Sequence, residues 1–193
     1  MRLVYLYLLA VVLTVTSVEA REEFWYVGAG GGATFLNDKN DLFDEIDEKS
    51  FTARAYVGYR ASTYIALEID YGYYGEYDYT GVLDHTLVEK GTAEYKALTG
   101  SIVVMYPLVW DGIELFTPIG LCLIDTKTDE KSKTTTGYKA GFGVAYTPSF
   151  SKHFTMRVGV DVLVFDLEHE DATENKDYKQ NLVSTYATIQ YNF

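Results

Sequence analysis

Hydrophobic and polar residues alternate along most of the chain. In residues 181–193, Val183, Ile189 and Tyr191 share one face, while Ser184 and Gln190 share the other. Successive side chains of a β-strand point to opposite faces, so this period of two predicts strands rather than helices. Eight such segments follow one another: Phe24–Leu36, Phe51–Ser62, Thr63–Tyr77, Thr92–Tyr106, Gly112–Ile124, Thr135–Thr147, His153–Leu167 and Asn181–Phe193.

The connections between these segments alternate between long and short. The long, polar ones are Asn37–Ser50, Asp78–Gly91, Asp125–Thr134 and Glu168–Gln180; the short ones are Arg60–Thr63, Pro107–Gly112 and Pro148–Lys152. Outer-membrane barrels have short periplasmic turns and longer outer loops, with both termini on the periplasmic side. The alternation therefore predicts an all-β fold, an eight-stranded antiparallel up-and-down transmembrane β-barrel.

Glycine is common on the polar faces of the predicted strands. A soluble barrel or sandwich also alternates, with its apolar face inside, so alternation does not identify the face that meets lipid. Glycine weakens a strand, but it makes room where side chains crowd inside a narrow barrel. We therefore expect the polar faces to line a lumen and the apolar faces to meet lipid. These glycines are Gly28, Gly30, Gly32, Gly58, Gly72, Gly120, Gly141, Gly143 and Gly159.

Aromatic residues gather near the ends of the predicted strands. Rings at the two water–lipid boundaries form girdles around membrane barrels. The pattern predicts one girdle that includes Trp25, Trp110, Tyr146 and Tyr191, and a second that includes Tyr71 and Tyr73. By their place along the chain, four further rings are also expected in the second girdle: Tyr74, Tyr77, Tyr95 and Phe165.

The first twenty residues differ from the rest of the chain. Arg2 precedes an apolar run from Leu3 to about Val15, and the stretch ends in Val18-Glu19-Ala20. This pattern predicts a secretory signal peptide over residues 1–20, cleaved after Ala20. Residues 21–193 then form one outer-membrane β-barrel domain. An uncleaved membrane helix is the alternative, although the run is shorter than the ~20 residues that a spanning helix needs.

The charge and cysteine content exclude two classes of protein. The formal net charge is −12, which is the wrong sign for a nucleic-acid partner. The single cysteine, Cys122, cannot form an internal disulfide, and alternation directs it inward as a small buried thiol.

Six charged residues fall on the predicted luminal faces at middle depth: Arg54, Glu68, Asp70, Lys139, Arg157 and Asp161. Three are positive and three negative, and pairing offsets the cost of taking ions out of water. We expect a charged network that plugs the lumen. A narrow, gated ion pore is the alternative.

Other motifs give no support for an enzyme or a cofactor. Gly28–Ala33 matches G-x-G-x-x-A, but no helix follows to face a phosphate, so no cofactor is expected. No histidine has a metal-ligand spacing. His85 and His169, with Ser132 and nearby acids, leave open a lipid A-modifying enzyme. The acidic loops 37–50 and 168–180 are expected to be solvated, and His153 lies in a short turn.

Five short motifs follow one another along the chain: WYVGAGGG (25–32), YVGYR (56–60), ALEIDYGYY (66–74), TPIGLCL (117–123) and YATIQYNF (186–193). With these motifs the chain resembles the OmpA-like family of small eight-stranded outer-membrane barrels. The resemblance implies an integral protein of the bacterial outer membrane, in contact with membrane lipid and lipopolysaccharide. It also implies that Phe193 is the signal read by the barrel-assembly machinery.

These observations together favour a non-enzymatic barrel with a structural and surface-interaction role. The exposed loops would meet a host or surface ligand that the sequence does not identify. A secreted lipocalin is a further alternative, but Glu23 stands where the G-x-W motif of that family would place glycine before Trp25.

Overall fold

A computed structural model of the chain describes residues 23–38, 45–46, 49–83, 87–128, 132–170 and 175–193. The predicted signal peptide, residues 1–20, lies outside this part. The strands are β1 (Phe24–Asp38), β2 (Glu45–Ile46), β3 (Lys49–Arg60), β4 (Ile65–Leu83), β5 (Leu87–Pro107), β6 (Ile113–Thr128), β7 (Ser132–Tyr146), β8 (Phe154–Glu170) and β9 (Asn175–Asn192). Among the residues that the structure describes, no helix is long and apolar enough to cross a membrane.

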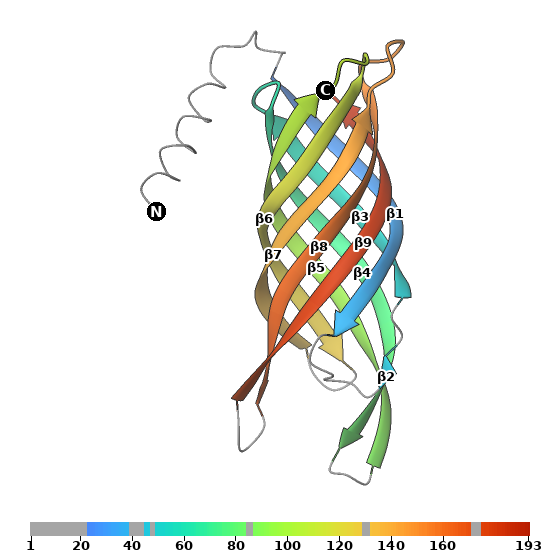
Figure 1. Cartoon of the computed structure of the whole chain (residues 1–193), viewed down its shortest axis with the longest axis vertical. Coiled ribbons are helices and arrows are strands. Elements are labelled where there is room, and N and C mark those ends of the chain that lie inside the picture. The colour runs from blue at the N-terminus through green and yellow to red at the C-terminus, as the bar shows by residue number, and fades with distance from the viewer. Residues whose placement is uncertain (1–22, 39–44, 47–48, 84–86, 129–131, 171–174) are drawn as a thin grey trace, which may run out of the picture.

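Eight long strands close into an antiparallel barrel (Figure 1). The hydrogen-bonded order runs β4-β3-β1-β9-β8-β7-β6-β5, and pairing between β4 and β5 closes the ring. The two-residue β2 pairs with the outer part of β4, Glu45 opposite Thr80 and Ile46 opposite Tyr79, and takes no part in closure. The predicted eight-stranded, all-β barrel is confirmed. Closure removes the exposed strand edges that an open sheet would present.

The turns at one end of the barrel are short, and the C-terminus lies at this end (Figure 1). These turns occupy 61–64, 108–112 and 147–153, as the sequence predicts. Thr63 and Tyr64 belong to the first turn and not to the following strand. The reason is local: the Ser62 hydroxyl accepts hydrogen bonds from the backbone N–H groups of Tyr64 and Ile65, at 3.2 and 3.1 Å, which fixes the turn.

Three of the predicted long loops are mostly strand. The pairing of β4 with β5 continues to Leu83 opposite Leu87, that of β6 with β7 to Lys127 opposite Ser132, and that of β8 with β9 to Glu170 opposite Asn175. The β4–β5 and β8–β9 hairpins project beyond the barrel at the end away from the C-terminus (Figure 1). The predicted loops 78–91, 125–134 and 168–180 are too long because polar side chains do not end a strand. Backbone hydrogen bonds between strands do not depend on that polarity.

The apolar face of each strand points out of the barrel and the polar face points in. Leu121 and Val158 are 65% and 63% exposed, whereas Lys139 and Asp161 are 1% and 0% exposed. This is the reverse of a soluble protein, and it is the arrangement that lipid requires of a membrane barrel. The prediction that the polar, glycine-containing faces point inward is confirmed.

A β-bulge in β4 reverses the alternation near the long-hairpin end. Between Tyr73 and Glu76 the register against β5 shifts by one residue, and Gly75 adopts a φ of +98°. A bulge accommodates one extra residue in a strand. Tyr77 shares the numbering parity of the outward Tyr71 and Tyr73, yet it is fully buried. Its placement in the outer aromatic girdle was therefore wrong.

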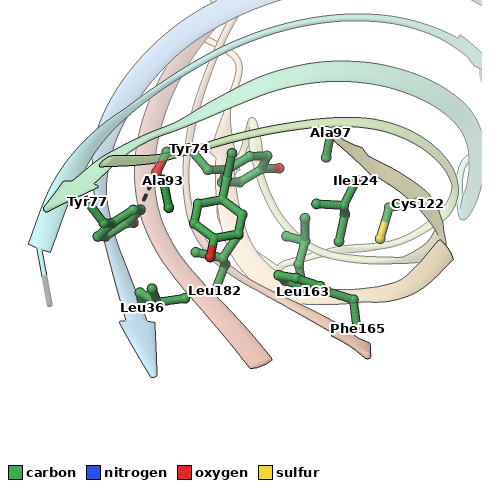
Figure 2. Packing of buried hydrophobic residues seen from close by; sticks show 11 residues of the cluster. Leu36, Tyr74, Tyr77, Ala93, Ala97, Cys122, Ile124, Leu163, Phe165 and Leu182 are labelled. Carbon is green, nitrogen blue, oxygen red and sulfur yellow. Dashed lines mark hydrogen bonds between the residues drawn. The ribbon is translucent and has the colours of Figure 1, made fainter. Parts of the chain in front are cut away.

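The lumen is filled by two apolar clusters with charged residues between them. Figure 2 shows the cluster at the long-hairpin half: Leu36, Tyr74, Tyr77, Ala93, Tyr95, Ala97, Cys122, Ile124, Leu163, Phe165 and Leu182. The cluster at the short-turn half contains Tyr26, Tyr56, Ala66, Val103, Met105, Phe116, Ala145 and Tyr186. The predicted girdle position is therefore also wrong for Tyr74, Tyr95 and Phe165, which lie inside the barrel. The face of the strand on which a residue lies decides whether its side chain points in or out, and its place along the chain does not.

Candidate functional site

The structure brings all six charged residues predicted for the lumen into one region. Arg54 lies on β3, Lys139 on β7 and the other four on β4 and β8: Glu68, Asp70, Arg157 and Asp161. All six are buried. In each strand the charged residue occupies an inward position in the alternation, so the sequence determines locally that these side chains enter the lumen.

Four of the six form a compact cluster in the middle of the lumen. Arg54 donates to Asp161 at 2.7 Å and to Asp70 at 3.1 Å. Lys139 contacts the same two carboxylates, at 2.6 Å from Asp70 and 3.2 Å from Asp161. Each cation therefore touches both anions, and the cluster is neutral. The Tyr186 hydroxyl adds a hydrogen bond to Asp161 at 3.1 Å.

Arg157 and Glu68 form a separate pair nearer the short-turn end. Nη1 of Arg157 lies 2.7 Å from Oε2 of Glu68, which also accepts a hydrogen bond from the Tyr26 hydroxyl at 3.1 Å. The guanidinium lies 5.1 to 5.2 Å from the ring centroids of Tyr26, Tyr56 and Phe116. Aromatic faces attract such a cation, so this arginine is held by one carboxylate and three rings.

A further luminal ion pair was not predicted. Arg60, at the end of β3, donates to both carboxylate oxygens of Glu114 on β6, each at 2.8 Å, and also to the backbone oxygens of Ser62 and Thr63. The sequence does contain a signal for it, because Arg60 shares the inward parity of Arg54. It was missed because Arg60 was assigned to a turn.

Some of the ion pairs join neighbouring strands, as Arg54–Asp70 and Lys139–Asp161 do, and others cross the lumen, as Arg54–Asp161, Lys139–Asp70 and Arg157–Glu68 do. Around the barrel, Arg157 and Glu68 lie on opposite strands, with β9, β1 and β3 between β8 and β4. Buried ions lose their hydration, and the loss is offset only where good geometry and further hydrogen bonds are present. The contacts above supply both. The arrangement joins opposite walls and occupies the space between them.

The residues predicted for the aromatic girdles lie on the outer surface. Trp25, Tyr146 and Tyr191 lie near the short-turn ends of β1, β7 and β9, and Trp110 lies in the turn 108–112. Tyr71 and Tyr73 lie in the middle of β4, because this strand continues to Leu83. The large rings are well exposed, from 40% for Tyr191 to 70% for Trp110, and Tyr73 is half-buried against Phe51, with ring centroids 5.1 Å apart. Three more of the predicted girdle rings are exposed in the same way: Trp25, Tyr71 and Tyr146.

Phe193 lies at the short-turn end of the barrel, where its backbone N–H donates to the oxygen of Trp25 at 2.9 Å. Its side chain is exposed and packs edge-to-face on Tyr191, with the centroids 5.2 Å apart. The terminal ring is thus held at the seam between β1 and β9 and remains accessible to another protein.

The described residues contain no group of three or more His, Cys, Asp or Glu side chains that could hold a metal. His85 lies outside the described residues, and His169 is placed by its backbone alone. Ser132 donates to Asp125 at 2.9 Å, and Cys122 is a buried free thiol. Gly28–Ala33 lies within β1, which continues as a strand to Asp38.

The sequence of residues 20–193 matches the family model described as the OmpA-like transmembrane domain. The chain belongs to this family. Its members are small outer-membrane β-barrels, and the closed eight-stranded architecture described above agrees with that assignment. No curated protein sequence matches the chain.

Several solved outer-membrane barrels share the fold. Neisserial surface protein A is 13% identical, with a TM-score of 0.65, and the match covers 90% of this chain and all of that one. Ail of Yersinia pestis is 12% identical, with a TM-score of 0.53 over 90% of this chain and all of Ail. OprG of Pseudomonas aeruginosa is 10% identical, with a TM-score of 0.54 over 90% and 97%. At these identities the likeness concerns the fold alone.

Proposed function

We propose that this barrel is a non-enzymatic integral protein of the bacterial outer membrane with a closed lumen, a structural role and projecting hairpins that act as an interaction surface. The observation that carries the proposal is the layering of the lumen. An ion-paired layer lies between two clusters of buried apolar side chains. An ion that entered would have to leave water and displace these layers.

The orientation follows the rule for outer-membrane barrels. Short turns and the C-terminus lie at one end and two long hairpins at the other (Figure 1). In such barrels the short turns are periplasmic, so the β4–β5 and β8–β9 hairpins would face outward from the cell. Export through the predicted signal peptide, residues 1–20, and insertion by the barrel-assembly machinery through Phe193 belong to the same proposal.

Fractionation and planar-bilayer recording test the proposal. We expect the protein in the outer-membrane fraction, with a gel band whose mobility changes on boiling. The purified barrel should give no steady conductance. A stable folded monomer in buffer without detergent would contradict the membrane assignment, and steady single-channel currents from the wild type would contradict a closed lumen.

A narrow ion pore is the second candidate, and one observation favours it. Lys139 and Arg54 each touch both Asp70 and Asp161, so partners could be exchanged without leaving any charge bare. A pore of this kind predicts wild-type currents that change in Arg157→Ala. The absence of current in both proteins would remove it.

Enzymatic modification of lipid A is the less favoured alternative. It predicts that lipid A from cells with and without the protein differs in mass. Identical mass spectra would exclude it, and a shifted acyl or phosphate pattern would exclude the non-enzymatic role.

The role of the projecting hairpins is testable by excision. Thr80 pairs with Lys90 near the tip of the β4–β5 hairpin, so residues 80–90 can be replaced by Asn-Gly, a two-residue hairpin turn. The barrel should still fold, and cells that carry the shortened protein should adhere less to surfaces than cells that carry the intact one. Equal adhesion would contradict an interaction role for this hairpin.

A further inference from the structure

We infer that a hollow on the outer wall of the barrel, over β4 to β7, binds an acyl chain of lipid A in the outer leaflet, with the phosphate held by two lysines above it. This inference rests on the orientation in the proposed function and adds a site and a ligand to it.

The hollow has a volume of about 930 Å³ and is lined largely by apolar side chains. Outward residues of four strands form its rim, among them Leu67, Ile69, Leu98, Ile102, Leu121 and Tyr138. The volume falls within the ~300–1,000 Å³ of small-molecule sites. A largely apolar hollow in the lipid-facing wall favours a hydrocarbon chain over a polar ligand.

Gly100 creates the hollow. It lies on the outward face of β5 between Leu98 and Ile102, opposite Ile69 on β4 and Leu121 on β6. A Cβ added at Gly100 would meet no atom within 4 Å. The luminal glycines make room for neighbouring rings or backbone. Gly100 is not required by crowding, and the missing side chain leaves open space among the larger side chains around it.

The hollow lies in the half of the wall nearer the long hairpins. Beyond Lys96 the outward positions of β5 carry no charge as far as Tyr106, a span of ~25 Å along the barrel axis for ten tilted strand residues, which matches the apolar band of an outer-membrane barrel. Gly100 lies four residues from Lys96, or about 10 Å below it. An acyl chain that enters the hollow therefore has its headgroup level with Lys96.

Four outward charged residues lie at that level on β5 and β6. Glu94 pairs in register with Lys127, and Lys96 with Asp125. Lys96 also contacts Glu94 at 2.8 Å, and Asp125 accepts the hydrogen bond from Ser132. Ammonium groups attract lipid phosphates, while carboxylates bind divalent cations. Lipid A carries phosphates that divalent cations bridge, so its headgroup matches a patch of both signs better than a phospholipid with one phosphate.

Native mass spectrometry of the purified barrel in detergent, titrated with lipid A in Mg²⁺, tests the site. The wild type should retain one lipid A. Gly100→Leu places a side chain in the middle of the hollow and should weaken binding about tenfold. The double variant Lys96→Gln/Lys127→Gln should weaken it about thirtyfold and reduce its dependence on salt. Ala187→Leu adds the same side chain to the outer wall on β9 and should bind as the wild type does.

Each alternative result counts against the site. Equal lipid A binding by Gly100→Leu and Ala187→Leu would overturn the inference. Binding of phosphatidylglycerol or phosphatidylethanolamine as tight as that of lipid A would also overturn it. So would a dimer in which a second copy of the chain takes the place of the lipid. The heat-modifiable band is recorded for every variant and confirms that each is folded. If that band lies in the outer membrane while lipid A does not bind, the inference fails and the proposed function stands.

Discussion

Arg157 on β8 reaches across the barrel to Glu68 on β4, with its Nη1 2.7 Å from the carboxylate oxygen Oε2. Three strands separate β8 from β4 on the side that runs through β1. The two residues are 89 positions apart in the chain. The pair therefore connects opposite walls, and its loss is expected to affect the whole barrel and not one hairpin.

Removing one member of this pair should destabilise the barrel strongly. Arg157→Met leaves Glu68 buried without its cation, and the expected loss is about 3–5 kcal/mol in the free energy of unfolding. Unfolding by urea in detergent micelles measures it. The double variant Arg157→Met/Glu68→Leu leaves no bare charge and should recover most of the loss. A double variant as unstable as the single one would contradict this account.

An exposed ion pair provides the matched comparison. Lys96→Gln breaks the contact with Glu94 on the outer surface, and exposed pairs contribute little because water and salt screen them. The unfolding midpoint of Lys96→Gln should stay close to that of the wild type. A loss as large as that of Arg157→Met would show that the effect does not depend on burial.

Gly58 should not tolerate even a methyl group. A Cβ at Gly58 would overlap the ring of Tyr26, whose hydroxyl donates to Glu68. Gly58→Ala is expected to displace the ring and cost about 1–3 kcal/mol, as measured by unfolding in micelles. Gly100→Ala on the open outer face is the control and should be neutral or slightly stabilising, because a glycine in a strand is replaced without a clash. Equal effects at the two positions would refute the crowded lumen.

Gly75 should be required by its backbone conformation. Its φ is +98°, a value that costs other L-residues about 1–2 kcal/mol, and an added Cβ would also overlap the Ser50 side chain. Gly75→Ala should therefore lower the unfolding free energy by at least that amount. Stability equal to that of the wild type would mean that the bulge between Tyr73 and Glu76 is not present as described.

Cys122 reports directly on the closed lumen. The thiol is 2% exposed and lies among the apolar residues of the long-hairpin half (Figure 2). A water-soluble maleimide should not label the folded barrel within the time needed to label the boiled protein completely, as followed by mass spectrometry. A cysteine introduced on the outward side of a hairpin, Asp78→Cys, should label at once in the folded protein. Rapid labelling of Cys122 in the folded state would contradict a filled lumen.

Much of the barrel follows from local patterns. The alternation predicts which face of each strand is apolar, and the three short connections predict antiparallel neighbours. Both were confirmed, together with the number of strands that close the ring. The inward direction of Lys139 and Arg157 needs nothing beyond the parity of their positions. The lengths of the hairpins do not follow, because polar residues 78–91 and 168–180 are compatible with strand or loop.

The sequence by itself determined the strands, their two faces and the set of charges enclosed, because a strand's side-chain direction is set by its own backbone. Tertiary structure alone decided the rest. It matched Arg157 with Glu68 and Lys139 with Asp70, since the stagger of strands around a closed barrel sets which inward residues share a depth. It also reversed the direction of Tyr77, because the bulge at Gly75 adds one residue to β4 that the alternation does not count.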